Sequence, residues 1–275
     1  MNSVPREIAE SSLPVTVIVP AYNASASLQR AISSVLAQSQ QAAEIIIVDD
    51  ASSDDTWNEI ERLRTAVVGP KLVTIRLAEN LGAADARNAA WDVASQQYVA
   101  FLDADDFWHP RKLEVQYGWM SRHPNVALCG HRCEVADGGL EVFSPIAETP
   151  VRYFGLNSFL VANRLSTPTV MLKRALGFRF AKGKRYAEDY LLWMSIVSSY
   201  GPAAFIDLPL AFLFKAKYGA AGLSSHAWPS HIGVLDTMSR LRRDHIISGP
   251  VWLLAMIWSW IKFARRSVAL MFARK

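Results

Sequence analysis

The chain contains the stretch Tyr98-Val-Ala-Phe-Leu-Asp-Ala-Asp-Asp106, in which an apolar run leads directly into three carboxylates. A short apolar run that stops at a polar turn is typical of a strand buried within a sheet. Carboxylates crowded at the end of such a strand repel one another unless a cation, or a metal bound to a polyphosphate, shares the site. The stretch therefore predicts a buried strand that ends at a site for a divalent cation.

Strand and helix patterns alternate along the chain before this stretch. Apolar and β-branched runs predict strands, and apolar residues at helical spacing predict the helices between them. The expected strands cover residues 15–20, 44–48, 72–77 and 98–102, and the expected helices cover residues 25–38, 54–63 and 83–94. This alternation predicts an α/β fold with a Rossmann-like, mostly parallel sheet flanked by helices on both faces.

Polar residues follow the end of each predicted strand. They are Tyr22 and Asn23 after the first strand, Asp49 and Asp50 after the second, Asn80 after the third, and Asp103 to Asp106 after the fourth. Ligands bind beyond the carboxyl ends of the strands in such sheets, so these residues are expected to share one site. The sequence has neither a G-x-G-x-x-G turn after the first strand nor a G-x-x-x-x-G-K-[ST] loop. A metal-assisted nucleotide site therefore remains the prediction.

Five segments of the chain carry a resemblance to a known family. They are Val17-Ile-Val-Pro-Ala-Tyr-Asn23, Ile47-Val-Asp-Asp-Ala-Ser52, Glu79-Asn-Leu-Gly82 with Ala86-Arg-Asn88, Phe101-Leu-Asp-Ala-Asp-Asp106 and Ala187-Glu-Asp-Tyr190. In this order, over residues 14–195, the set resembles glycosyltransferase family 2, whose members are inverting enzymes of the GT-A fold. The Gln-x-x-Arg-Trp motif of its processive members is absent, which implies the transfer of a single sugar per encounter.

The resemblance implies contacts with the nucleotide of a sugar donor. A tyrosine placed like Tyr22 lies against the base, and an acid placed like Asp50 accepts a hydrogen bond from the base. The other residues that the resemblance places beside the nucleotide are Pro20, Asn80, Arg87 and Asp103.

The resemblance also implies a metal ligand and a catalytic base. Asp105 corresponds to the direct ligand of Mn²⁺ or Mg²⁺, with Asp103 toward the ribose or a metal-bound water. A cation held by carboxylates and phosphate oxygens neutralises the charge that builds on a leaving diphosphate. Asp189, the second acid of the Glu188-Asp189 pair, corresponds to the general base that takes the proton of an attacking hydroxyl. Inversion at the anomeric carbon follows, without a covalent intermediate.

Taken singly, these residues also have structural explanations. The acids that precede Pro110 suit the cap of a following helix, and Glu188-Asp189 suits a helix N-terminus. Arg87 has Asp85 and Asp92 as alternative ion-pair partners. Packing or ordinary turn roles are the alternatives for Tyr22, Trp108, Asp49 and Asp50.

The composition disfavours nucleic-acid binding and indicates contact with a membrane. The formal net charge is +4, but the last fourteen residues hold five Lys and Arg and no acid, so the remainder sums to −1. A nearly neutral body lacks the basic face that a nucleic-acid binder needs. A composition that is 51% hydrophobic, with nine tryptophans and a mean hydropathy of +0.11, is apolar for a freely soluble enzyme.

The cysteines and the N-terminus indicate a reducing compartment. Cys129, His131 and Cys133 supply three zinc ligands at most, whereas a structural zinc site needs four, so we expect two free thiols. The first fourteen residues carry Glu7 and Glu10 where a signal peptide needs an apolar run. The expected location is cytoplasmic, peripheral at the inner face of the cell membrane.

The C-terminal segment predicts an amphipathic helix. Its uninterrupted apolar run, Val251 to Ile261, has eleven residues, whereas a membrane span needs about twenty. On a helical wheel Ser259, Lys262 and Arg266 share one face, and the tryptophans lie elsewhere. This pattern favours a helix that lies on a membrane surface and binds anionic lipid. The alternative is a helix docked on the protein's own core or on a dimer partner.

Four segments are expected along the chain. Residues 1–13 form a polar tail, residues 14–124 the nucleotide-sugar-binding half, residues 125–227 the acceptor-side half, and residues 228–275 the C-terminal helical segment. The acceptor-side half includes a predicted mobile loop at residues 215–225 and His226, which is expected at the surface. Lys182-Gly-Lys-Arg185 is a candidate phosphate contact, with a solvated loop as the alternative.

These patterns together predict an inverting, nucleotide-sugar-dependent glycosyltransferase. A UDP-sugar is the expected donor, and a saccharide or lipid-linked acceptor in surface polysaccharide or glycolipid synthesis is the expected acceptor. Transfer to a polyprenyl phosphate, and a sugar-nucleotide-binding protein without turnover, remain alternatives. A nucleotidyltransferase is disfavoured because Pro20-Ala-Tyr-Asn23 is not a glycine- and lysine-rich phosphate loop.

Overall fold

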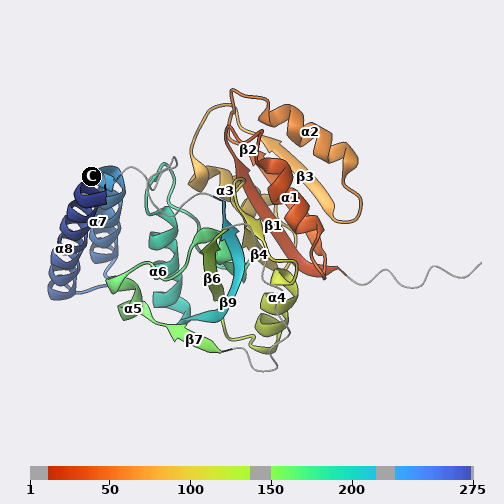
Figure 1. The fold of residues 1–275 in the computed structure, drawn as a ribbon. Helices are drawn as coiled ribbons and strands as arrows, with labels where there is room; N and C mark the ends of the chain where they lie inside the picture. The colour runs from red at the N-terminus through yellow and green to blue at the C-terminus, as the bar shows by residue number, and fades with distance from the viewer. Residues whose placement is uncertain (1–11, 137–149, 215–226, 274–275) are drawn as a thin grey trace, which may run out of the picture.

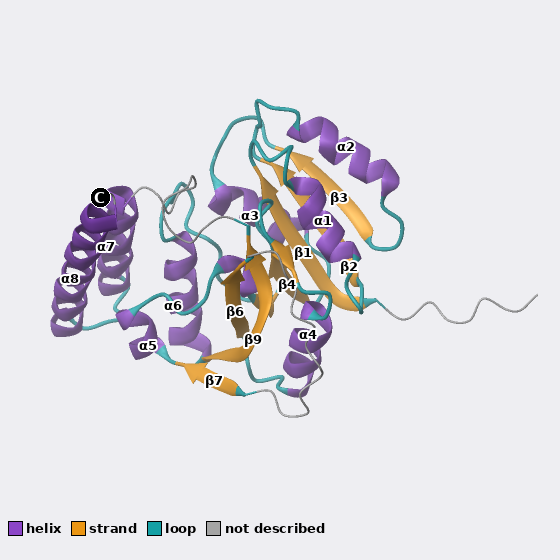
Figure 2. Ribbon diagram, viewed as in Figure 1, coloured by secondary structure: helices purple, strands orange, loops and turns teal. Residues whose placement is uncertain are grey.

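The computed structural model describes residues 12–136, 150–214 and 227–273, with side chains up to residue 268. A nine-stranded sheet runs through the molecule in the order β3-β2-β1-β4-β8-β6-β9-β5, and β7 pairs with β9. Helices pack on the sheet, and two long helices lie side by side at the end remote from β3 (Figure 1, Figure 2).

The first half of the sheet follows the sequence prediction. Strands β1 (Leu13–Ala21), β2 (Ala42–Asp49), β3 (Lys71–Arg76) and β4 (Tyr98–Phe101) alternate with helices α1 (Leu28–Leu36), α2 (Thr56–Ala66) and α3 (Ala83–Val93). All pairings among these four strands are parallel. The α/β prediction is confirmed, and the predicted element ends differ from the observed ones by at most three residues.

The second half of the sheet is mixed. Its elements are β5 (Phe107–Trp108), α4 (Lys112–Arg122), β6 (Leu128–Val135), β7 (Val151–Phe154), α5 (Leu156–Val161), the 3-10 turn η1 (Thr167–Thr169), β8 (Met171–Lys173), α6 (Glu188–Tyr200) and β9 (Ala203–Leu213). Strand β8 is antiparallel to β4 and to β6, whereas β6 and β9 are parallel. The continuous run of parallel strands that begins at β3 therefore ends at β4. The alternation of strand and helix patterns in the sequence ends at the same strand.

Two apolar clusters cover opposite faces of the sheet. Val17 and Val19 of β1 pack in one cluster with Ile32 of α1, whereas Ile18 packs in the other with Trp91 of α3. Successive side chains of a strand point to opposite faces, so a strand buried on both faces is apolar at every position. The central strands are therefore fixed from both sides, which holds their carboxyl ends in place.

Helices α7 (Ala227–Arg243) and α8 (Gly249–Ala273) form a hairpin beside α6 (Figure 1). The predicted C-terminal helix is therefore present. Within the part of the chain that the structure describes, no helix combines the length and the apolarity needed to cross a membrane.

Some predictions concern parts of the chain that the structure does not test. The predicted mobile loop at residues 215–225, His226 and most of the polar tail lie outside the described residues. The division into a nucleotide half and an acceptor half stays a prediction. Cys129 and Cys133 both lie on strand β6, and neither forms a disulfide bond.

Candidate functional site

A cavity of about 650 Å³ opens beyond the carboxyl ends of β1 and β4. Strand β1 lies between β2, the next strand along the chain, and β4, which the chain reaches only after β3. An α/β sheet opens a ligand crevice where the strand order reverses in this way. The ends of β1, β2 and β4 line the cavity together with the start of α6. The predicted site residues that line it are Pro20, Tyr22, Asp50, Arg87, Asp103, Asp105 and Asp189.

The end of β1 presents an exposed aromatic ring to the cavity. Tyr22 is 52% exposed, although it lines the cavity wall, so its ring is accessible to a flat ligand. Trp108, by contrast, is 1% exposed, and its Nε1 donates to the carbonyl of Pro168. The packing alternative therefore holds for Trp108 and not for Tyr22.

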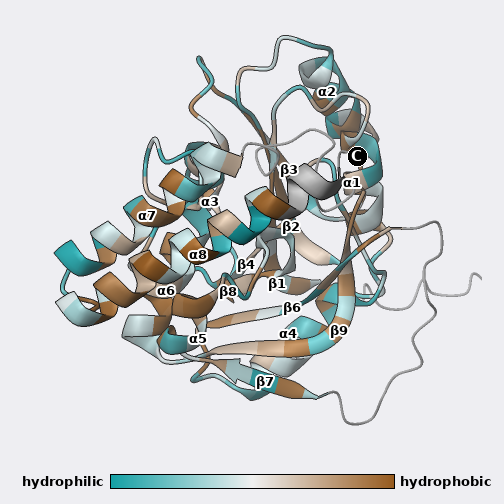
Figure 3. Cartoon of the chain, turned by 60° about the vertical axis from the view of Figure 1, so that its left-hand side comes forward, coloured by the Kyte–Doolittle hydropathy of each residue, from teal (hydrophilic) through white to brown (hydrophobic). Residues whose placement is uncertain are grey.

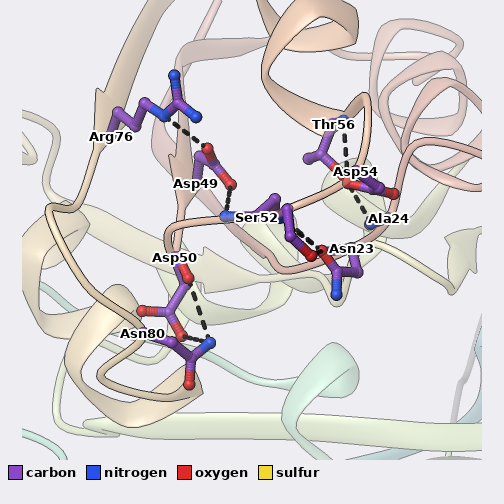
Figure 4. A network of polar contacts seen from close by, with 10 residues as sticks. Asn23, Ala24, Asp49, Asp50, Ser52, Asp54, Thr56, Arg76 and Asn80 are labelled. Atoms are coloured by element: carbon purple, nitrogen blue, oxygen red, sulfur yellow. Dashed lines mark hydrogen bonds and ion pairs between the residues drawn. The ribbon is translucent and has the colours of Figure 1, made fainter.

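Asp50 is a buried carboxylate that holds the turn after β3. Its Oδ1 accepts from the N–H of Leu81 at 2.8 Å, and its Oδ2 accepts from the N–H of Gly82 at 2.8 Å. The same Oδ2 accepts from Asn80 Nδ2 at 3.0 Å (Figure 4). Burial raises the pKa of Asp50, against the opposite effect of these hydrogen bonds and of Arg185. A carboxylate offers about four acceptor positions. Three hydrogen bonds therefore leave Asp50, which lines the cavity, with acceptor capacity, whereas Asn80 is not among the lining residues.

Asp49 and its neighbours fix the turns around the cavity. Asp49 accepts from the N–H of Ser52 at 3.0 Å and pairs with Arg76 at 3.2 Å, and Ser52 Oγ accepts from the N–H of Asn23 at 2.9 Å (Figure 4). Asn23 and Ala51 have left-handed backbones with φ of 48° and 56°. This conformation costs an alanine about 1–2 kcal/mol. The turn alternative therefore holds for Asp49. The surrounding contacts hold the strained backbone of Asn23 and Ala51 in place.

The acids that follow β4 do not cap the next helix. The N-cap of α4 is Arg111, and no side chain caps it, so the capping alternative is wrong. Asp106 is buried, whereas Asp103 and Asp105 are half-buried on the cavity wall. Arg30 Nη2 of α1 donates to the carbonyl of Asp105 at 2.9 Å, which fixes the loop that carries these acids.

Asp103 and Asp105 fit a cation that is shared with phosphate oxygens. In the described ranges, no group of three His, Cys, Asp or Glu could enclose a metal ion by itself. Mg²⁺ is usually held by one or two carboxylates and completes its coordination with substrate phosphates and water. Two carboxylates on one cavity wall match that donor set when a diphosphate supplies the remaining oxygens.

Arg87 joins the two acidic parts of the cavity. Its Nη2 donates to Asp103 Oδ1 at 2.7 Å and its Nη1 donates to Glu188 Oε1 at 3.0 Å, while its side chain is 5% exposed. Burial acts to lower the pKa of Arg87, but the charges of Asp103 and Glu188 outweigh it, so the pKa is raised. Asp85 and Asp92 bind other residues, so the alternative pairing is wrong.

Asp189 lies in the first turn of α6 with its carboxylate held on both oxygens. Its Oδ1 accepts from the N–H of Tyr190 at 2.6 Å, and its Oδ2 accepts from Asn163 Nδ2 at 3.0 Å. Burial and the charge of Glu188 raise the pKa of Asp189 to about 7, although Tyr190, Arg87 and Asn163 favour its ionised form. A carboxylate with such a pKa can take a proton from a hydroxyl near neutral pH.

The sequence analysis missed the segment that orients Asp189. Asn163 lies two residues beyond α5, whose last residue, Val161, accepts hydrogen bonds through its carbonyl from α8. The donors are Trp258 Nε1 at 3.0 Å and Lys262 Nζ at 2.7 Å. Helix α8 therefore holds the end of α5, and the segment that follows α5 reaches the carboxylate of Asp189. No local pattern near Asn163 signals this arrangement.

The basic string at residues 182–185 divides between the fold and the cavity. Lys184 is buried and pairs with Asp236 of α7 at 2.6 Å. Arg185 lines the cavity, and its Nη2 donates to Asn80 Oδ1 at 3.1 Å. The solvated-loop alternative therefore fails for Lys184, whereas Arg185 is exposed but lines the cavity and joins the candidate site. Further lining residues that the sequence analysis missed are Thr167, Tyr186 and Ser230.

Comparison with known proteins identifies the family. A sequence model described as Glycosyl transferase family 2 matches residues 16–194. The chain belongs to glycosyltransferase family 2. This glycosyltransferase is 35% identical over 183 residues to UDP-Glc:alpha-D-GlcNAc-diphosphoundecaprenol beta-1,3-glucosyltransferase WfgD of Escherichia coli, covering 66% of this chain and 69% of WfgD. It is 29% identical to the putative teichuronic acid biosynthesis glycosyltransferase TuaG of Bacillus subtilis, over 92% of this chain and 96% of TuaG.

A solved structure shows the same fold. Mannosyltransferase PcManGT from Pyrobaculum calidifontis, in complex with GDP-Man and Mn²⁺, superimposes with a TM-score of 0.63 at 19% identity, covering 94% of this glycosyltransferase and 76% of PcManGT. The predicted family, enzyme class and GT-A architecture are therefore confirmed. The roles of individual residues stay proposals.

Proposed function

We propose that this glycosyltransferase moves one sugar from a nucleoside-diphosphate sugar to a hydroxyl of its acceptor, with inversion at the anomeric carbon. One observation carries the proposal: Arg87 pairs with both Asp103 and Glu188, so the acids after β4 and the acid pair of α6 share one cavity. Inverting transfer needs charge stabilisation at the leaving group and a base at the acceptor, both within reach of the same sugar.

The nucleotide would bind at the ends of β1 and β2. The exposed ring of Tyr22 offers a stacking surface, and Asp50 keeps acceptor capacity for an N–H group such as that of uracil. Asn80 would act on the nucleotide indirectly, because its Nδ2 donates a hydrogen bond to Asp50 Oδ2. Arg185 would bring a positive charge to the same side of the cavity, and UDP is the expected carrier.

The leaving diphosphate would lie toward the acids that follow β4. Asp105, with Asp103, would hold Mn²⁺ or Mg²⁺, and the bound cation would neutralise charge on the departing diphosphate. Arg87 keeps Asp103 oriented because its buried guanidinium pairs with that carboxylate at 2.7 Å. Arg30 holds the backbone of Asp105 in place from the other side.

Asp189 would act as the general base at the acceptor. Its carboxylate takes the proton of the attacking hydroxyl, while Tyr190 N–H and Asn163 keep the oxygens in fixed positions. The raised pKa of Asp189 improves its strength as a base, and the group is ionised above neutral pH. Its position beside Glu188, which bonds to Arg87, argues against a binding protein without turnover.

Replacing Asn163 by Ala is expected to move the acid limb of the pH profile upward. The change removes a hydrogen bond to the ionised form of Asp189, so the pKa of that base rises. A hydrogen bond to a charged group is worth ~1.5 kcal/mol, which corresponds to a shift of about one pH unit. The measurement is kcat/KM between pH 5 and 9, which reports ionisations of the free enzyme.

Asn157, exposed on the preceding helix α5, provides the matched control. The acid limb of the kcat/KM profile of Asn157→Ala should coincide with that of the parent. A limb that stays in place in both variants would remove Asn163 from the orientation of the base.

The relatives suggest the class of acceptor. WfgD is named for a diphosphoundecaprenol-linked acceptor and TuaG for teichuronic acid biosynthesis. We therefore propose a lipid-linked saccharide acceptor in surface polysaccharide or glycolipid synthesis, which confines the reaction to a membrane surface. Transfer to a polyprenyl phosphate is the alternative, and it would be recognised by a product that forms without any saccharide acceptor.

A metal-dependence experiment tests the donor side of the proposal. A panel of nucleotide sugars should bind and turn over only with added Mn²⁺ or Mg²⁺, and EDTA should abolish both. Asp105→Asn is expected to lower turnover by about 10²-fold, a usual loss when one group that stabilises developing charge is removed. The control is Asp92→Asn, because Asp92 pairs with Arg179 on the surface. Parental turnover by Asp105→Asn in the presence of EDTA would end the proposal.

A further inference from the structure

The outer side of α8 is apolar, which reverses the usual pattern of a surface helix. From Leu253 onward, its exposed residues are Leu253, Leu254, Ile257, Trp258, Trp260, Ile261, Ala264, Arg265 and Val268, which we call the α8 outer face. At 100° per residue these positions fall within an arc of about 160°. Arg265 is the charged member of this face. Figure 3 shows α8 on the outside of the molecule, with hydrophobic residues along its ribbon.

The inner side of α8 carries polar residues beside the apolar residues Trp252, Ala255 and Met256, which pack on the core. Ser259 is 4% exposed, and its Oγ lies 3.3 Å from His231 Nδ1 of α7. Lys262 Nζ donates to the carbonyl of Val161, and burial, followed by the charge of Arg164, lowers the pKa of Lys262. The predicted polar face thus docks on the protein, as the core-docking alternative held. A helix whose apolar residues served only the core would have the opposite orientation.

Two exposed tryptophans are fixed at the edge of the α8 outer face. Trp228 of α7 is 53% exposed and Trp260 is 44% exposed, with ring centroids 6.0 Å apart. Both rings pack on Phe263, which stacks on His231 at 4.5 Å. These contacts order the rings without burying them. Ordered, half-exposed tryptophans are typical of a membrane–water interface, where one side of the ring is wet and the other apolar.

The distribution of charge indicates an anionic partner. Residues 227–275 contain eight Lys and Arg and two Asp, a net charge of +6, whereas the whole chain carries +4, so residues 1–226 sum to −2. Arg242 and Arg243 are exposed at the end of α7. A second copy of the chain would bring another +6 to the same contact, whereas anionic lipid complements this charge.

We propose that the α8 outer face lies on an anionic lipid bilayer, with the helix parallel to the surface and its apolar arc in the headgroup boundary. An interfacial helix binds through buried apolar area and through attraction to anionic headgroups, and the α8 hairpin supplies both. The proposal deepens the proposed function and rests on it only for the acceptor. Helix α7 packs on α8 and lines the cavity through Ser230. A bilayer on the α8 outer face would therefore hold a lipid-linked acceptor on the side of the molecule where α7 reaches the cavity.

Vesicle flotation of the full chain without donor tests the surface. The parent should float with vesicles of phosphatidylglycerol and phosphatidylcholine, and less with phosphatidylcholine alone or at high salt. The triple variant Leu253→Asn, Leu254→Asn and Ile257→Asn should lose about 100-fold in partitioning, because three exposed apolar side chains no longer enter the boundary. The control replaces the exposed apolar residues Val68 and Val93 by Asn, and it should float like the parent.

Sedimentation without vesicles and thermal melts complete the test. The replaced side chains of α8 are exposed, so the triple variant should melt near the parental temperature. Equal flotation of the parent and the triple variant would overturn the proposal. It would also be overturned if the parent does not float and sediments as a dimer that the triple variant does not form. Donor hydrolysis is assayed separately. A parent that floats but consumes no nucleotide sugar would end the proposed function and leave the membrane surface supported.

Discussion

Asp189→Asn is expected to lower kcat by about 10³-fold and to leave the affinity for the nucleotide unchanged. The amide has the size of the carboxylate and can still accept from Tyr190 N–H, but it cannot take a proton from an acceptor hydroxyl. Turnover is measured as release of the nucleoside diphosphate, and affinity by calorimetry with the same nucleotide. Asp92→Asn, outside the cavity, should retain the parental kcat.

The same replacement is expected to stabilise the fold at neutral pH. Because the pKa of Asp189 is raised in the folded protein, its contribution to stability is present below the unfolded pKa and is lost as pH rises through about 7. Removing the charge should therefore raise the free energy of unfolding by about 1 kcal/mol at pH 8, after allowance for solvent screening. Thermal melts at pH 8 and pH 4 should show a gain only at the higher pH. Undiminished turnover in this variant would exclude Asp189 as the base.

Arg87→Met is expected to lower the free energy of unfolding by about 3 kcal/mol at pH 7, because removing one partner leaves buried charges uncompensated. The side chains of Arg87, Asp103 and Glu188 are 5%, 30% and 12% exposed, so water screens the two carboxylates only in part. Urea denaturation at pH 7 measures this deficit.

The control for Arg87→Met is Arg62→Met on α2. Arg62 forms an ion pair with Glu59 on the surface, and its side chain is 55% exposed, so its loss should leave the denaturation midpoint within experimental error. The Arg87 variant should also lose about 10²-fold in kcat, since Asp103 is no longer held. An Arg87→Met protein as stable and as active as the parent would remove the observation on which the proposed function rests.

The strand ends could be predicted because their signals are local. Each of the first four strands is an apolar run that stops at polar residues, and parallel strands bring those residues to one edge. Tyr22, Asp50, Asp103 and Asp105 were found in this way. The different contacts of Asp49 and Asp50 could not be predicted, because they depend on which of the two carboxylates accepts hydrogen bonds from the turn at residues 80–82.

Contacts between distant segments had no counterpart in the sequence pattern. The alternative for Arg87 was an ion pair with near neighbours on its own helix, but its partners lie 16 and 101 residues away. Asn163 was not assigned to the site, and Arg185 was named only within a candidate phosphate contact, because nothing near them in the chain indicates the groups that they meet. Such pairings arise only when the sheet and α6 are packed together.

The sequence by itself determined the fold class, the family and the edge of the sheet at which the chemistry lies, because hydrophobic periodicity and short motifs are properties of neighbouring residues. The tertiary structure alone decided the ion pairs of Arg87, the orientation and raised pKa of Asp189, and the outward turn of the apolar side of α8. Burial and charge depend on what surrounds a group in space, and a linear pattern does not contain that information.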